Sequence, residues 1–126
     1  MTAREGLVYV VDDDEHVRES IEVLLELHGF TVLGFPSGEM FLDHPRAERR
    51  SCLVLDVEMP GLSGLEVLAR ICGDRFIVLT LVMTARATAR VRDTVAQAGA
   101  TLFEKPFVPT HLVSTIADGL SPGRLH

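Results

Sequence analysis

The chain has 126 residues, of which 47% are hydrophobic, with a formal net charge of −6 and a sequence pI of about 5.3. This length suits one domain with a single core and leaves no room for a second. The negative charge argues against direct binding to nucleic acid, because attraction to phosphates provides most of the non-specific affinity of nucleic-acid-binding proteins.

Neither a membrane-spanning segment nor an export signal is expected. The longest apolar run, residues 76–83, is far shorter than the ~20 residues that a membrane-spanning helix needs. The first residues lack the apolar core of a signal peptide. Cys52 and Cys72 form no CxxC pair and are expected to be buried, reduced thiols. We therefore expect a cytoplasmic protein.

Strand-like apolar runs alternate with segments whose apolar residues recur at helical spacing. The predicted strands are residues 7–11, 30–35, 52–55, 76–83 and 101–104. Three helices are predicted from what precedes them: the N-cap Asp14, the N-cap Ser37, and the Pro- and Gly-containing loop 59–64. Two further helices are predicted over residues 87–98 and 110–120. Five such βα units predict an α/β fold with a parallel sheet and right-handed crossovers.

Polar residues follow directly on four of these strands. Asp12 and Asp13 come after the first strand, and Asp56 comes after the third. Thr84 follows the fourth strand and Lys105 the fifth. Because α/β proteins bind ligands at the carboxyl ends of their parallel strands, we expect these side chains to converge on one edge of the sheet.

The residue types at this edge limit the chemistry available to it. Carboxylates bind a hard divalent cation through oxygen, and one carboxylate can act as a nucleophile. A hydroxyl can donate to a phosphoryl oxygen, and a lysine adds a compact positive charge. The set therefore predicts a phosphoryl acceptor that works with Mg²⁺. Asp14 fits an N-cap better than a third metal ligand, because backbone amides take up its side chain.

With their neighbours, these residues resemble the receiver domain of two-component response regulators. The resemblance rests on Val10-Val11-Asp12-Asp13, on Asp56 with Met59-Pro60 and Ser63-Gly64, on Met83-Thr84-Ala85, on Gly99-Ala100 and on Lys105-Pro106-Phe107. It implies a flavodoxin-like (βα)5 three-layer sandwich whose parallel five-stranded sheet has the order 2-1-3-4-5. The receiver would cover residues 1–121, with 122–126 as a linker or tail. The start of the chain and Glu-Lys-Pro-Phe most resemble receivers of LuxR-type transcriptional regulators.

The resemblance implies a role for each acidic residue. Asp56 is similar to the carboxylate that takes a phosphoryl group from a phosphohistidine on a sensor histidine kinase or phosphotransfer protein. Asp12, Asp13, Asp56 and the backbone carbonyl of Glu58 are similar to the ligands of Mg²⁺, for which Mn²⁺ could substitute. Glu58 and Arg86 stand at positions that flank the path of the hydrolytic water and tune the rate of dephosphorylation. Their charges could pair across the mouth of the site, or the two side chains could be solvated independently.

The resemblance also assigns the switch residues. Thr84 is similar to the hydroxyl that moves toward the phosphoryl group, with the small Ala85 leaving the site open. Lys105 is similar to the residue that pairs with the phosphoryl group, and its bond to Pro106 would be cis.

Leu102 lies three residues before Lys105, where most receivers have the aromatic switch residue. The chain has one residue fewer than usual between Gly99-Ala100 and Lys105. If the turn before the strand absorbs this difference, Leu102 is the switch residue. If the strand absorbs it, Phe103 takes that place, but Lys105 would then turn to the other face of the sheet. We favour the turn.

The function implied is a Mg²⁺-dependent phospho-switch that catalyses only its own phosphorylation and dephosphorylation. It would change the surface formed by the last two helices and the last strand, control transcription through a domain outside this chain, and could form a phosphorylation-dependent homodimer. The alternatives are a stand-alone phosphorelay receiver, an unphosphorylated scaffold and a haloacid-dehalogenase-like Mg²⁺-dependent phosphatase. The intact acidic set argues against the scaffold. His16 and the lack of an acidic pair after Lys105 argue against the phosphatase.

Overall fold

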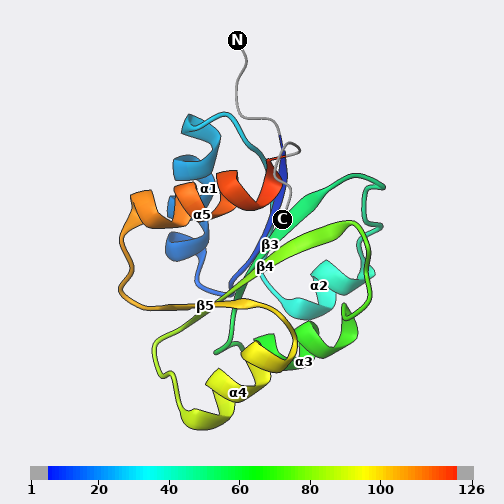
Figure 1. Cartoon of the computed structure of the whole chain (residues 1–126), viewed down its shortest axis with the longest axis vertical. Coiled ribbons are helices and arrows are strands. Elements are labelled where there is room, and N and C mark those ends of the chain that lie inside the picture. Colours follow the sequence, from blue (N-terminus) through cyan, green and yellow to red (C-terminus); the bar gives the residue numbers. More distant parts are fainter. Residues whose placement is uncertain (1–5, 122–126) are drawn as a thin grey trace.

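A five-stranded parallel sheet with helices on both faces forms the structure, a computed structural model that describes residues 6–121 (Figure 1). The strands are β1 (Leu7–Val11), β2 (Thr31–Phe35), β3 (Ser51–Asp56), β4 (Ile77–Thr84) and β5 (Thr101–Glu104). They are arranged in the order β2-β1-β3-β4-β5, as predicted. The winding direction reverses between β1 and β3, so a crevice is expected where these two strands end.

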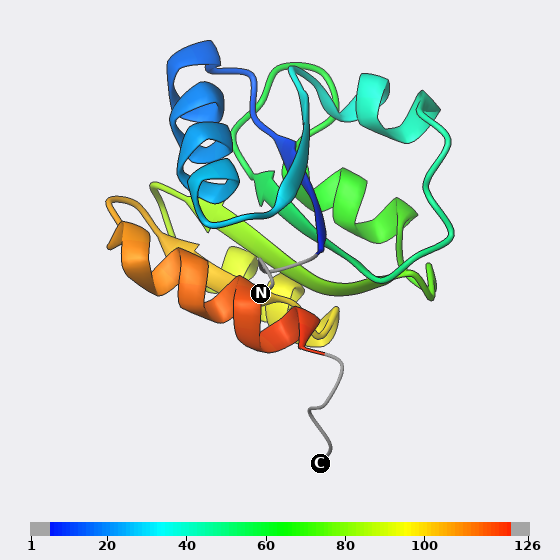
Figure 2. The ribbon, with the colours of Figure 1, turned by 90° about the horizontal axis from the view of Figure 1, so that it is seen from above.

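Helices cover the sheet in two layers, which confirms the predicted three-layer sandwich. They are α1 (Glu15–Leu27), α2 (Gly38–Asp43), α3 (Gly64–Arg70), α4 (Ala89–Gln97) and α5 (Pro109–Leu120). Helices α1 and α5 lie together on one face, and α2, α3 and α4 lie on the other (Figures 1 and 2). The predicted linker or tail, residues 122–126, lies outside the described residues.

Side-chain caps fix where the helices begin. The Asp14 carboxylate accepts the backbone N–H groups of the first turn of α1, so its predicted N-cap role is confirmed. Ser37 caps α2, and Ser63 forms a reciprocal capping box with Glu66 at the start of α3. Helix α4 begins two residues later than predicted because Thr88 caps it.

Each face of the sheet has its own core. Every residue of β1 and β3 is buried, as expected for central parallel strands. In β1, Tyr9 and Val11 pack against the α2, α3 and α4 side, whereas Val8 and Val10 pack against α1 and α5. This period-two alternation places the end of each strand, and so each site residue, in a fixed direction.

Strand β5 has the register that was favoured from the sequence. Leu102 packs against the core on the α4 side, and Phe103 is buried in the core on the α5 side. Glu104 is paired with Thr84, and the Lys105 N–H donates to the Thr84 carbonyl at 2.8 Å. The turn before β5 therefore absorbs the missing residue, and Lys105 keeps its place beside the ends of β3 and β4.

Two further expectations have different outcomes. Cys52 is buried, but Cys72 is exposed in the turn after α3, so the expectation of a buried thiol is wrong at that position. Within residues 6–121, no helix has the length and apolar character needed to cross a membrane.

Candidate functional site

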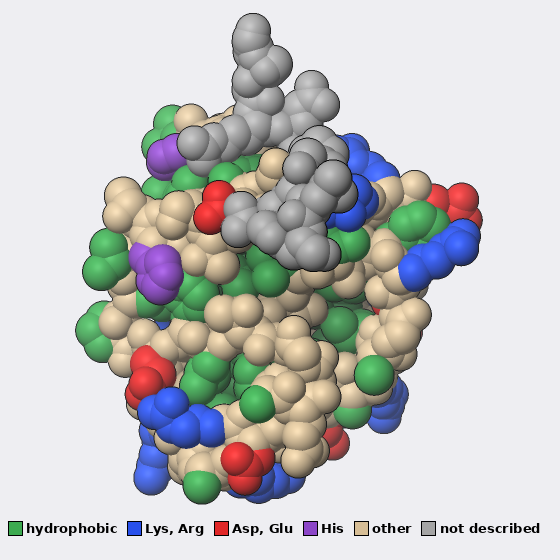
Figure 3. Space-filling model, in the orientation of Figure 1, with side chains coloured by type: hydrophobic (Ala, Val, Ile, Leu, Met, Phe, Trp, Pro, Cys, Tyr) green, Lys and Arg blue, Asp and Glu red, His purple; other side chains and the backbone are tan. Residues whose placement is uncertain are grey.

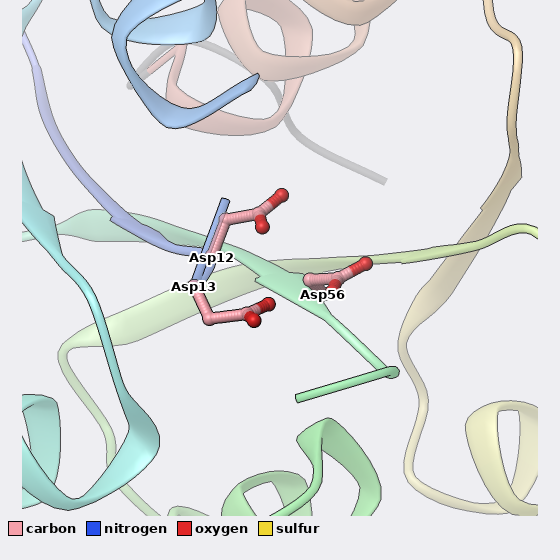
Figure 4. Close-up of side chains that lie close together, drawn as sticks. All are labelled: Asp12, Asp13 and Asp56. Carbon is pink, nitrogen blue, oxygen red and sulfur yellow. The ribbon is translucent and has the colours of Figure 1, made fainter. Parts of the chain in front are cut away.

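Three carboxylates meet where β1 and β3 end, as predicted. Asp56 is the last residue of β3, and Asp12 and Asp13 follow β1 directly. Because β1 and β3 are paired, with Val11 opposite Leu55, the residues that follow them emerge side by side. One oxygen of each of the three carboxylates lies within 4.8 Å of the others, and all three side chains extend to the same side (Figure 4).

Backbone contacts hold these residues in place. The Asp12 N–H donates to the Phe35 carbonyl, and the Asp12 carboxylate accepts the Asp14 N–H at 2.9 Å. From α1, the Arg18 guanidinium donates to the Asp12 carbonyl at 2.9 Å. The site is therefore supported by β2 and α1 as well as by the strands that carry the carboxylates.

Burial raises the pKa of two of the three carboxylates. Asp12 and Asp56 are 1% and 2% exposed, whereas Asp13 is exposed. Loss of solvation raises the pKa of Asp56 to about 6 despite its hydrogen bond to Lys105, and burial likewise raises the pKa of Asp12. Asp12 Oδ2 is buried with no hydrogen-bond partner among the described residues. A cation beside these oxygens would relieve both costs.

Lys105 is the cation that the chain itself supplies. Its Nζ donates to Asp56 Oδ1 at 2.8 Å and lies 3.9 Å from Asp12 Oδ2. Burial lowers the pKa of Lys105, but its hydrogen bond to Asp56 and the surrounding carboxylates outweigh this effect and raise it. The Lys105–Pro106 peptide bond is cis, as expected.

Thr84 and Glu58 make a contact that the sequence did not predict. Thr84 is the last residue of β4 and is fully buried. Its hydroxyl donates to Glu58 Oε2 at 2.5 Å, and the Ala85 N–H donates to Glu58 Oε1 at 3.2 Å. Arg86 N–H donates to the Thr84 hydroxyl oxygen at 3.0 Å. The Glu58 side chain thus bridges the loop after β3 and the end of β4.

Residues 8–117 match the family described as the response regulator receiver domain. The chain belongs to the response regulator receiver family. This receiver is 37% identical over 114 residues to the transcriptional regulatory protein FixJ of Azorhizobium caulinodans, a match that covers 90% of this chain and 54% of that protein. The receiver thus spans about half the length of the curated relatives it matches, and transcriptional regulators by name are among them, as expected.

Solved structures show the same fold. The receiver superposes on full-length FixJ from B. japonicum with a TM-score of 0.81 at 34% identity, covering 96% of this chain and 61% of that one. It superposes on the BeF3-activated DrrB receiver domain with a TM-score of 0.78 at 29% identity, covering 89% of this chain and 94% of that one. The shared part is the receiver alone.

The acidic cluster of this receiver fits a divalent metal ion. Carboxylate oxygens are the ligands that Mg²⁺ and Mn²⁺ prefer, and Asp12, Asp13 and Asp56 each present one such oxygen to a common point. The buried Asp12 oxygen, which lacks a hydrogen-bond partner among the described residues, supports the same assignment. The backbone carbonyl of Glu58 stays a predicted ligand.

Of the two alternatives left open for Glu58 and Arg86, the ion pair is not formed. The Glu58 carboxylate is taken up by Thr84 and Ala85, and no ion pair of Glu58 with Arg86 exists within residues 6–121. The physical reason is proximity, because the β4 hydroxyl and N–H lie next to the carboxylate while exposed ion pairs contribute only ~0–1 kcal/mol. A role of either residue in tuning the dephosphorylation rate stays a prediction.

A groove between α1 and the start of α5 was missed from the sequence. It has a volume of about 490 Å³ and is lined mainly by apolar atoms of α1 and of the segment between β5 and α5. Its walls include His16, Val17 and Leu24 on one side and Phe107 and Pro109 on the other. The signal that could have found it is the apolar residues Val17 and Phe107, which follow closely on Asp12 and Lys105 in the sequence.

Proposed function

We propose that this receiver accepts a phosphoryl group onto Asp56 from a phosphohistidine on a sensor histidine kinase or phosphotransfer protein, in the presence of Mg²⁺. One observation carries the proposal: three carboxylates and a lysine meet at one edge of the sheet. A cluster of three carboxylates, two of them buried, does not serve stability, since burial of charge is costly unless it is compensated.

The residues divide the chemical step among them. A carboxylate oxygen of Asp56 bonds to phosphorus as the bond from phosphorus to the imidazole nitrogen breaks, and the imidazole leaves with the electron pair of that bond. Lys105 lies within hydrogen-bond distance of Asp56 and can balance the charge on the transferred group. Held by Asp12, Asp13 and Asp56, Mg²⁺ would neutralise the donor and acceptor anions that must approach each other. The pKa of Asp56, about 6, leaves most of it ionised at neutral pH.

The groove between α1 and the β5–α5 segment supports a protein donor. Its lining includes His16, four residues after Asp12, and Phe107, two residues after Lys105, and its walls are mainly apolar. Val23 and Leu27 extend the exposed apolar surface along α1, at 55% and 79% exposure. A partner helix carrying a phosphohistidine could pack here while its imidazole faces Asp56.

The output that we propose is transcription, through a domain outside this chain. The matched parts cover only 54% and 57% of the curated relatives named as transcriptional regulators. Phosphorylation would draw Thr84 toward Asp56 and change the surface of α4, β5 and α5, which could support a homodimer. Lys and Arg side chains lie scattered over the face shown in Figure 3, and the net charge of −6 argues against direct DNA binding by the receiver. The exposed free Cys72 fits a cytoplasmic location.

The test is an intact-mass measurement after incubation with acetyl phosphate. With Mg²⁺ the native protein should gain one phosphoryl group, and with a chelator it should gain none. Asp56→Asn should gain none in either case, while Asp93→Asn, a change at an exposed carboxylate on α4, should behave like the native protein. Equal gain by Asp56→Asn would refute the assignment, and continuous turnover of the donor would favour the phosphatase.

A further inference from the structure

The Glu58 carboxylate accepts hydrogen bonds from two neighbouring donors at the carboxyl end of β4. These donors are the Thr84 hydroxyl and the Ala85 N–H. Glu58 reaches them from the loop after β3, two residues beyond Asp56. In the proposed function the Thr84 hydroxyl donates to a phosphoryl oxygen on Asp56, and the Ala85 N–H is the next donor along the chain. A carboxylate of the protein therefore already occupies them.

Neither donor can serve two acceptors at once. The Thr84 hydroxyl has one proton to donate, and so has the Ala85 backbone nitrogen. The bond from Thr84 to Glu58, at 2.5 Å, has the length of a charge-assisted hydrogen bond, whereas the competing Arg86 carbonyl is 3.1 Å from the hydroxyl. A phosphoryl oxygen can take these protons only after Glu58 has released them.

We propose that the Glu58 carboxylate competes with the phosphoryl group for the hydrogen-bond donors Thr84 and Ala85. The carboxylate holds Thr84 and Ala85 while Asp56 is unmodified, and it swings out to solvent when Asp56 is phosphorylated. The proposal rests on the proposed function, because it assigns to Glu58 the regulation of that same site. The contact is autoinhibitory: it lowers the affinity of the site for a phosphoryl group and so sets how far phosphorylation engages Thr84.

Burial and charge support this exchange. Glu58 is exposed, so its side chain can leave without disturbing the core, whereas Thr84 is fully buried at the end of β4. The negative charge of Glu58 also acts on the site itself, where it is one of the influences that raise the pKa of Lys105. Repulsion between the carboxylate and an anionic phosphoryl group adds to the competition for the two protons.

The experiment measures the affinity for beryllofluoride, a stable phosphoryl mimic, at saturating Mg²⁺ by ¹⁹F NMR. Glu58→Ala should bind it about 3- to 10-fold more tightly than the native protein, the range expected for one ordinary hydrogen bond, because solvent screens the charge of the exposed Glu58. Glu58→Gln, which keeps the oxygen acceptor but not the charge, should fall between them. The control is Glu15→Ala, which removes an exposed carboxylate from the first turn of α1 and should leave the affinity unchanged.

A coupling measurement separates competition from a general effect of charge. In a Thr84→Ala background, which removes the main donor, Glu58→Ala should increase the affinity less than half as much as in the native background. In the metal-free protein, Glu58→Ala should also shift the Ala85 amide resonance, which Glu15→Ala should not do.

The outcomes distinguish this proposal from the one on which it rests. If the native protein binds beryllofluoride in an Asp56-dependent way but Glu58→Ala binds it no more tightly, competition by Glu58 is refuted and the phospho-switch stands. Competition by Glu58 is also refuted if the effect of Glu58→Ala is undiminished in Thr84→Ala. If the native protein does not bind beryllofluoride with Mg²⁺, both proposals fall.

Discussion

Asp56 is a carboxylate whose burial raises its pKa and makes its ionised form costly in the absence of a bound cation. It is 2% exposed, and burial raises its pKa from an ordinary 3.8 to about 6. Lys105 offsets part of this cost through one hydrogen bond. Asp12 shares the same environment, since one of its oxygens is buried without a hydrogen-bond partner among the described residues. Because burial disfavours the ionised carboxylates of Asp12 and Asp56, a cation that binds beside them would stabilise them.

The raised pKa of Asp56 has a measurable effect on stability in the absence of metal. Between pH 4 and 6 the folded protein keeps a proton on Asp56 that the unfolded chain has released, so stability falls as pH rises through this window. Asp56→Asn removes this ionisation while keeping an oxygen that Lys105 can bind. In chelator, urea unfolding should therefore show that the variant gains stability relative to the native protein from pH 4 to pH 7, by at most about 3 kcal/mol.

Asp93→Asn, at an exposed position on α4, serves as the control for the loss of one carboxylate. If the stability difference between Asp56→Asn and the native protein were the same at pH 4 and pH 7, the burial argument for Asp56 would be wrong.

Among the elements, the junction of β3 and α3 places Asp56 most directly. Gly64 begins α3, and its N–H donates to the Val57 carbonyl at 3.0 Å. A Cβ at position 64 would lie 2.1 Å from the Asp56 carbonyl oxygen, so the helix can approach the strand end only because residue 64 has no side chain. The close approach explains why a glycine stands at the start of α3.

Gly64→Ala should therefore destabilise the fold and displace the end of β3. Because the clash is with backbone, which cannot move aside cheaply, we expect a loss of at least about 2 kcal/mol in urea unfolding, near the upper part of the range for overpacking. Gly73→Ala is the matched control: its φ of +93° makes any side chain strained, but no atom lies within 4 Å of the added Cβ. A smaller loss for Gly64→Ala than for Gly73→Ala would contradict the close-approach argument.

Strand β5 carries the second prediction at the scale of elements. Leu102 faces the α4 side but has neither the ring bulk nor the polar tip of an aromatic switch residue. Phosphorylation should therefore bias the α4, β5 and α5 surface only weakly, whereas a clear two-state change needs several kcal/mol of differential stabilisation. Amide chemical shifts with and without beryllofluoride should show a small response in the native protein and a larger one in Leu102→Tyr.

The control is Leu102→Met, which keeps an apolar side chain of similar volume and should respond like the native protein. The idea fails if the native protein already shows a large response that Leu102→Tyr leaves unchanged.

Over the whole molecule, the features that follow from the spacing of apolar and polar residues could be predicted from the sequence. Alternating apolar runs and turn residues predicted five βα units, and the strand-end positions of Asp12, Asp56 and Lys105 predicted a common site. Parallel pairing then brings these residues together whatever the details of packing. The favoured register of Leu102 was also correct, since only that register leaves Lys105 at the site.

The features that could not be predicted from the sequence are the hydrogen-bond partners and the exposure of side chains near the surface. Glu58 could pair with Arg86 or bind Thr84, and these alternatives differ by about the ~1 kcal/mol that a single exposed contact contributes. Cys72 lies in the turn just after α3, where helical spacing no longer decides which side chains are buried. The contact of Glu58 and the exposure of Cys72 depend on local geometry, which the spacing of residues in the sequence does not determine.

The most direct test of the central claim is to identify the phosphorylated residue chemically. After reaction with acetyl phosphate and Mg²⁺, borohydride reduces an aspartyl phosphate to homoserine, which peptide mass spectrometry can locate. A phospho-switch of this architecture should yield homoserine at position 56 alone, with none in chelator. Homoserine at position 12, 13 or 14 with Asp56 unmodified would contradict the account, because the nucleophile would then belong to the loop after β1.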